Sequence, residues 1–229
     1  MIFVLLALLT LPPPQFKLTM DSVVWAIKHT MRDIADTGLN LALEVIDNIT
    51  KTDTTVANAF FQTYYLSLLS DSFYVLTDSD HKSGFKLQSI LLSRLYALVA
   101  SNAITSPLFD PAQVDPSTPN AIFVRDFTAD LLANAFPHLQ PIQIQTFVTG
   151  LFELKDDMNK FKLHLRDFLI QLKELQGDHA GAPAIEQANV PGAAAIEFEQ
   201  QEEERRQREA ARNAVPGMVK PALLEDEEL

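Results

Sequence analysis

Apolar side chains recur with helical spacing along most of the chain. The first series consists of Phe16, Met20, Val23, Val24, Ile27 and Met31, at steps of four, three, one, three and four residues. Steps of three and four place side chains on one face of an α-helix. Strict apolar–polar alternation, which would indicate strands, is almost absent. The pattern predicts an all-α fold.

The same spacing predicts seven helices joined mostly by short turns. They are expected over residues 15–31, 37–49 after an Asp36-Thr37 cap, 54–76, 84–100, 120–136 with Asn120 as cap, 141–154 and 159–175. Residues 104–119 contain four prolines, which break helix and sheet, and are expected to form a surface loop.

The predicted helices come as antiparallel pairs. The first helices of the first two pairs begin at Gln15 and Thr55, 40 residues apart. A period of about 40 residues with two helices in each repeat is typical of HEAT-type α-solenoids. An irregular helical bundle would give similar apolar series, so periodicity alone leaves both architectures open.

The composition changes near residue 176, and four regions are expected. They are an apolar remnant helix and proline turn (1–14), a HEAT-repeat domain (15–175), an Ala/Gly/Pro-rich linker (176–192) and a polar helix with an acidic tail (193–229). In the polar helix, Glu202–Arg206 and Glu204–Arg208 have the spacing of favourable ion pairs. The candidate regulatory residues are Glu202, Glu203, Glu204, Arg205, Arg206, Arg208, Glu225, Asp226, Glu227 and Glu228.

The net charge of −12 is concentrated at the C-terminal end. Residues 178–229 carry 5 basic and 12 acidic side chains, a net charge of −7. A chain of this sign repels a phosphate backbone, which argues against direct nucleic-acid binding. The absence of cysteine excludes disulfides and thiolate chemistry.

The stretch MIFVLLALLTL at residues 1–11 is apolar but too short for a membrane span, which needs about 20 residues. As a secretion signal it lacks a basic start and a small-residue cleavage site. The hypothesis that the protein is secreted or membrane-tethered therefore depends on this stretch alone. We expect a short apolar helix without its packing partner, ended by Pro12, Pro13 and Pro14, and no membrane insertion.

Candidate catalytic and ligand-binding residues are few. Asp78, Asp80 and His81 fall in one expected loop, where a solvated turn is favoured over a cation site because no glycine shapes the loop. Ser83 and Lys86 match the SxxK spacing of a nucleophile, but Ser83 is expected to cap a helix.

Two further features have simple structural interpretations. Trp25 and the phenylalanines are expected in the core, not in a ligand cage. Arg166-Asp167 is expected to be a surface pair in mid-helix. No nucleophile, base and orienting group come together, so no catalytic residue, cofactor or metal is predicted and the chain is not expected to be an enzyme.

Three stretches resemble a known family. They are LPPPQFKLTMDSVVWAIKHTMRDIADTGL, FFQTYY and ANAFPHLQPIQIQTFVTGLFELKDDMNKFKLHLRDFLIQLKE, and VPG follows at 215–217. They are similar to the C-terminal end of nuclear export receptors of the karyopherin-β family, which are ring-shaped HEAT solenoids. The resemblance implies repeats over residues 15–52, 54–100 and 120–154, and a closing helix at 159–175.

The resemblance also implies function. The family binds cargo carrying leucine-rich export signals together with the GTP form of the small GTPase Ran, passes nucleoporins, and shuttles between nucleus and cytoplasm. Its C-terminal helix and acidic tail lower cargo affinity when Ran is absent, although the helix residues here match poorly. The cargo groove and the N-terminal Ran-binding region of the family are missing, so we expect a fragment. The alternative is a free-standing helical adaptor without transport activity.

Overall fold

The computed structural model describes residues 11–78 and 84–179, with side chains up to Glu174. These residues form helices and no strand, which confirms the predicted all-α fold. The helices are α2 (Pro13–Ile27), α3 (Arg32–Ile49), α4 (Thr54–Thr77), α5 (Phe85–Ala100), α6 (Asn120–Ala135), α7 (Pro141–Leu154) and α8 (Met158–His179).

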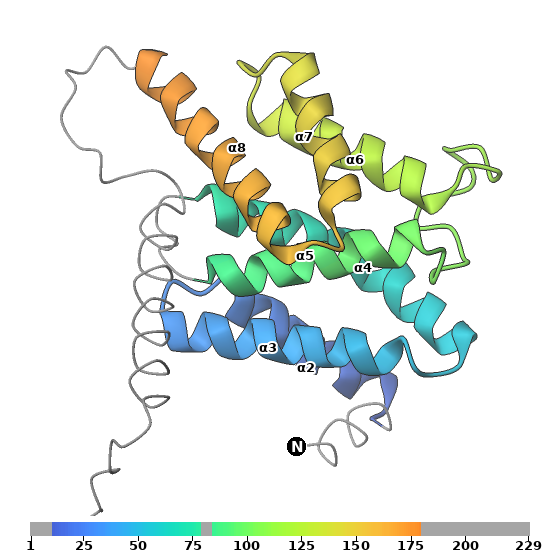
Figure 1. Ribbon diagram of the computed structural model, residues 1–229. Coiled ribbons are helices and arrows are strands. Elements are labelled where there is room, and N and C mark those ends of the chain that lie inside the picture. Colours follow the sequence, from blue (N-terminus) through green and yellow to red (C-terminus); the bar gives the residue numbers. More distant parts are fainter. Residues whose placement is uncertain (1–10, 79–83, 180–229) are drawn as a thin grey trace, which may run out of the picture.

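The helices form a stack of antiparallel pairs (Figure 1). The pair α2–α3 lies at one end, α4–α5 in the middle and α6–α7 beyond it, and α8 runs beside α7 and across α5. Between the first two pairs, α2 packs on α4 and α3 packs on α5. Between these two pairs, the first helix thus neighbours the first and the second neighbours the second, the stacking expected of a HEAT-type solenoid. Between the second and third pairs, α5 contacts both α6 and α7.

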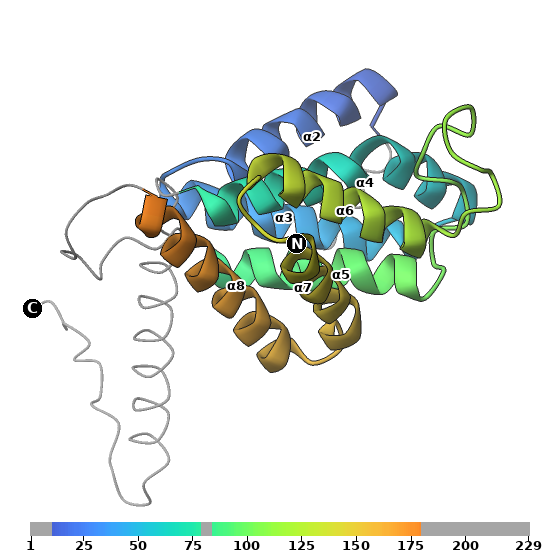
Figure 2. The ribbon, with the colours of Figure 1, turned by 90° about the horizontal axis from the view of Figure 1, so that it is seen from above.

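Helix α5 lies at the centre of the core. Of its sixteen residues, only Arg94 and Ala100 are exposed. It contacts α3, α4, α6, α7 and α8. The view from above shows α7 and α8 crossing over α5 (Figure 2). Full burial of a large apolar side chain is worth about 1.5–3 kcal/mol, so this helix supplies much of the driving force for stacking.

Two tyrosine hydroxyls link α5 to its neighbours inside the core. The hydroxyl of Tyr65 on α4 donates to the carbonyl of Leu95 at 2.9 Å. The hydroxyl of Tyr96 lies 3.1 Å from that of Thr128 on α6. Burial raises the pKa of both tyrosines, so the hydroxyls keep their protons and the core stays free of charge.

Two expectations for the connection between α2 and α3 are wrong. Asp36-Thr37 does not cap α3, because the helix already begins at Arg32. The Asp36 carboxylate instead accepts from the Arg32 guanidinium at 3.3 Å, one helical turn earlier. Met31 precedes α3 as its N-cap residue and is 60% exposed, so it does not extend the buried face of α2.

Two further expectations concern helix caps, and the one for Asn120 is wrong. Ser83, the suggested cap of α5, lies outside the described residues, and the residue directly before α5 is Gly84, at a φ of 86°. Only glycine adopts such a φ without strain, so the turn uses backbone freedom and not a side-chain cap. Asn120 is the first residue of α6 and Pro119 is the cap.

The Asn120 side chain holds the proline-rich loop. It accepts from the Leu108 N–H at 2.9 Å and donates to the carbonyls of Ile104 and Ser106 at 3.0 and 2.9 Å. From the other side, Asn58 on α4 accepts from the backbone N–H of Thr105 at 3.0 Å. The loop is therefore attached to two helices.

Ile104 and Leu108 are buried, so the loop lies only partly on the surface. Both buried residues lie in the first part of the loop, while most of residues 110–119 are exposed.

Aromatic stacking attaches α8 to α7. The rings of Phe147 and Phe168 are parallel, with centroids 3.7 Å apart. His164 on α8 also stacks on Phe147, with the two ring centroids 5.1 Å apart. Its Nε2 lies 2.8 Å from the Phe147 carbonyl oxygen. Gly150 leaves the space that the His164 ring fills. Helix α8 ends at His179, beyond the expected residue 175.

Gly38 allows α2 and α3 to approach closely. A methyl group at Gly38 would lie 2.7 Å from the Ala26 Cβ and 2.8 Å from the Ile27 backbone nitrogen. Backbone atoms cannot move aside without shifting the helix, so we expect Gly38→Ala to destabilise the protein by about 1–3 kcal/mol. In an exposed helix position the same change would stabilise by up to about 1 kcal/mol.

Urea unfolding followed by circular dichroism measures this effect. The exposed neighbour Thr37 provides the matched control, since Thr37→Ala should change the free energy of unfolding by less than about 0.5 kcal/mol. A Gly38→Ala variant as stable as the parent would show that the two helices are not in close contact.

Candidate protein-binding groove

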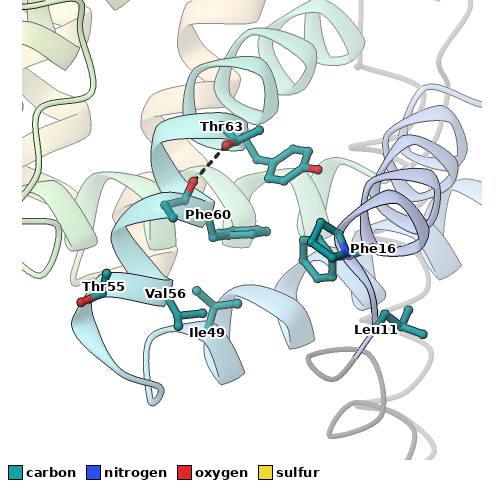
Figure 3. A pocket seen from close by; sticks show the side chains of 10 residues that line it. Leu11, Phe16, Ile49, Thr55, Val56, Phe60 and Thr63 are labelled. Carbon is teal, nitrogen blue, oxygen red and sulfur yellow. Dashed lines mark hydrogen bonds between the residues drawn. The ribbon is translucent and has the colours of Figure 1, made fainter.

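A groove of about 500 Å³ opens between α2 and α4 (Figure 3). Phe16 from α2 and Phe60 from α4 both line it, together with Ile49 at the end of α3 and Val56 near the start of α4. Leu11, which precedes α2, also lines it. The full lining is Leu11, Pro13, Phe16, Ile49, Thr55, Val56, Ala59, Phe60, Thr63 and Tyr64.

Three aromatic rings line the groove. The Phe16 ring lies 6.2 Å from both Phe60 and Tyr64, edge-on to each. The Phe60 and Tyr64 rings are 5.1 Å apart. Aromatic rings offer large apolar contact surfaces, so the groove suits apolar side chains.

Polar groups at the groove are bonded within their own helix. The Thr63 hydroxyl donates to the Ala59 carbonyl at 2.9 Å, drawn as the dashed line in Figure 3. Asp53 caps α4 by accepting from the Thr55 N–H at 2.8 Å, and this bond lowers the pKa of the carboxyl. The lining itself carries no charged side chain.

An ion pair lies near the Tyr64 side of the groove. Lys17 and Asp21 on α2 pair at 2.7 Å and are largely exposed. Burial, and next the negative charge of Asp21, raise the pKa of Tyr64, which therefore stays protonated at neutral pH. Charge is thus confined to the rim, where water reaches it.

The described residues offer a binding surface and no metal site. In residues 11–78 and 84–179 no three His, Asp or Glu side chains cluster closely enough to hold a metal ion. No helix in these ranges is long and apolar enough to cross a membrane.

The core position predicted for Trp25 is wrong. Its side chain is 60% exposed, and its ring contacts His29 edge-on at 4.9 Å. Leu18, two turns earlier on the same side of α2, is 68% exposed. Both lie on the outer side of the first helix pair, which no helix of the described ranges covers. Local periodicity marks an apolar face without showing whether a neighbour is present.

The other candidate residues have varied outcomes. Arg166 and Asp167 form the predicted surface pair, at 3.0 Å. Asp78 ends α4 as its C-cap residue, while Asp80 and His81 lie outside the described residues. The regulatory candidates at 202–208 and 225–228 also lie outside them.

Phe60 is part of the core as expected, with 5% exposure, and Phe16 packs against that core. Helical spacing alone therefore does not indicate the groove. The signal that could have indicated it is FFQTYY at 60–65, where four rings in six residues exceed what one buried face accommodates.

Stacked antiparallel helix pairs with an apolar groove between α2 and α4 define an α-helical repeat protein. Comparison with known proteins identifies the family. The family model described as CRM1 C terminal matches residues 2–177. The chain belongs to this family and corresponds to the C-terminal region of exportin-1.

Similar proteins include exportin-1 of Schizosaccharomyces pombe, 54% identical over 226 residues, which cover 97% of this chain and 20% of that protein. EXPORTIN 1B of Arabidopsis thaliana is 40% identical, covering 96% and 19%, and exportin-1 of Drosophila melanogaster is 39% identical, also covering 96% and 19%. The chain thus spans about a fifth of the length of these relatives. The match to the S. pombe protein includes most of residues 178–229, beyond the family model.

Proposed function

We propose that this chain supplies the C-terminal repeats of a nuclear export receptor, which binds leucine-rich-signal cargo together with the GTP form of a Ran-type GTPase. The observation that carries the proposal is the family match over residues 2–177, joined to relatives named exportin. The chain acts by binding and not by catalysis.

In this proposal the stacked pairs act as a scaffold. In a solenoid each repeat packs on its neighbours, so α2 to α8 would continue the stack of repeats at the C-terminal end of the receptor. The cargo groove of the family lies outside the regions that this chain resembles. Nucleoporins are further proposed partners, and the receptor shuttles between nucleus and cytoplasm through the pore.

Residues 193–229 are proposed to regulate cargo binding. This segment carries 10 acidic and 5 basic side chains, a net charge of −5, and aligns in large part with the S. pombe relative. A helix and tail that occupy the concave face without Ran, and leave it when Ran and cargo bind, would couple the two binding events.

A chimaera tests the export role. We expect S. pombe exportin-1 whose corresponding C-terminal fifth is replaced by this chain to export a reporter with a leucine-rich signal, because 54% identity preserves the repeat contacts. The measurement is the nuclear-to-cytoplasmic ratio of the reporter in cells without the native receptor. A reporter whose signal leucines are alanine is the control and should stay nuclear. Nuclear retention of both reporters, with a folded chimaera at normal abundance, would favour an adaptor without transport activity.

The regulatory proposal is tested in the same purified chimaera. Replacing Glu225, Asp226, Glu227 and Glu228 by their amides, or deleting 193–229, should raise Ran-free cargo affinity about fivefold or more. Affinity with Ran bound should change less, because the tail is already displaced.

A matched control neutralises four exposed acidic residues of the described helices: Asp33, Asp126, Asp130 and Glu153. If the tail substitutions and the control substitutions changed Ran-free cargo affinity equally, the effect would come from net charge in general. That result would contradict a specific regulatory role of the tail.

A further inference from the structure

The groove between α2 and α4 begins where the N-terminal stretch ends. Leu11 is part of the groove wall, and residues 1–9 directly precede it, separated only by Thr10 (Figure 3). We propose that residues 1–9, MIFVLLALL, bind in this groove in cis.

The chemistry of the two surfaces is complementary. All nine residues of the segment are apolar and none is charged. The groove presents Val56, which is 51% exposed, and the half-buried Phe16, while Phe60 beside them is only 5% exposed. The Thr63 hydroxyl donates to the Ala59 carbonyl, and the nearby Asp53 carboxylate accepts from the Thr55 N–H. Apolar surface is driven from water in proportion to its area, so contact between the segment and the apolar side chains of the groove is favourable.

The size of the groove suits a few side chains of the segment. Its volume of about 500 Å³ falls within the range of about 300–1,000 Å³ typical of sites that enclose small ligands. Part of the segment therefore fits between the helices, while the remainder covers the exposed Val56, which is 51% accessible.

The covalent connection through Thr10 and Leu11 favours binding of this segment over binding of the same segment from another molecule. Its attachment at Leu11 gives it a local concentration on the order of millimolar, as for short flexible linkers. Pro12 has a fixed φ of −55° and caps α2, so the chain direction at the groove is set by the proline turn.

Other parts of the chain fit less well. Residues 178–229 carry a net charge of −7, and binding them would place carboxylates against Phe16 and Phe60. Burying an unpaired carboxylate is strongly unfavourable. A second copy is the remaining occupant, and the experiment below distinguishes it.

The absence of cysteine permits a clean accessibility test in the full chain. Val56→Cys places a thiol in the groove wall, and Leu163→Cys on α8 is the control, since the two parent side chains are 51% and 47% exposed. We expect maleimide to modify Cys at position 56 about tenfold more slowly than at 163. Adding Leu5→Asp and Leu8→Asp should bring the two rates to within about twofold.

Equal rates in the unmodified N-terminal background would overturn the proposal. Slow labelling at position 56 that the two aspartates leave unchanged would also overturn it. Protection that is lost on dilution would assign the groove to a second copy instead.

A second measurement applies where the aspartate variant fails to fold. Leu8→Cys combined with Val56→Cys should be joined within one molecule by a short bis-maleimide, giving a cross-linked monomer. Leu8→Cys combined with Leu163→Cys should not. Cross-linked dimers, or equal yields for both pairs, would contradict binding in cis.

Discussion

Burial of α5 on nearly all sides is the constraint on which the rest of the structure depends. A helix with only Arg94 and Ala100 exposed needs neighbours around its whole circumference, and it obtains them from three successive pairs and α8. Leu91, Leu95 and Tyr96 have no measurable exposure. Because one helix contacts almost every other, the pairs are expected to unfold together and not one repeat at a time.

Polar groups set the register of this apolar core. Tyr65 binds the Leu95 carbonyl, and Ser93 donates to the Lys155 carbonyl at 2.7 Å, where the chain turns from α7 into α8. Asn58 and Asn120 hold the loop between the second and third pairs. A buried donor or acceptor left without its partner costs about 1–3 kcal/mol, so these contacts favour one arrangement over slipped alternatives. The stable stack then presents the groove, with Phe16 and Phe60 on separate helices held at a fixed separation.

Helical spacing predicted every described helix and the paired architecture, because core-facing residues repeat every three to four positions. It did not predict what depends on distant neighbours. Asn120 resembled a helix cap, since short polar side chains favour that position, but its partners lie 12 to 16 residues earlier in the loop. Trp25 resembled core because its helix is amphipathic, yet nothing in the described ranges covers it. The groove depends on two helices about 40 residues apart, which local patterns do not bring together.

Helix α5 forms the common core of one cooperative stack. Native-state amide hydrogen exchange in increasing urea can test this cooperativity. We expect the α5 amides to exchange most slowly, and only through global unfolding, with the same urea dependence as the slowest amides of α4 and α7. Exchange of α5 through a separate, smaller opening, or at a rate no slower than that of α2, would contradict it.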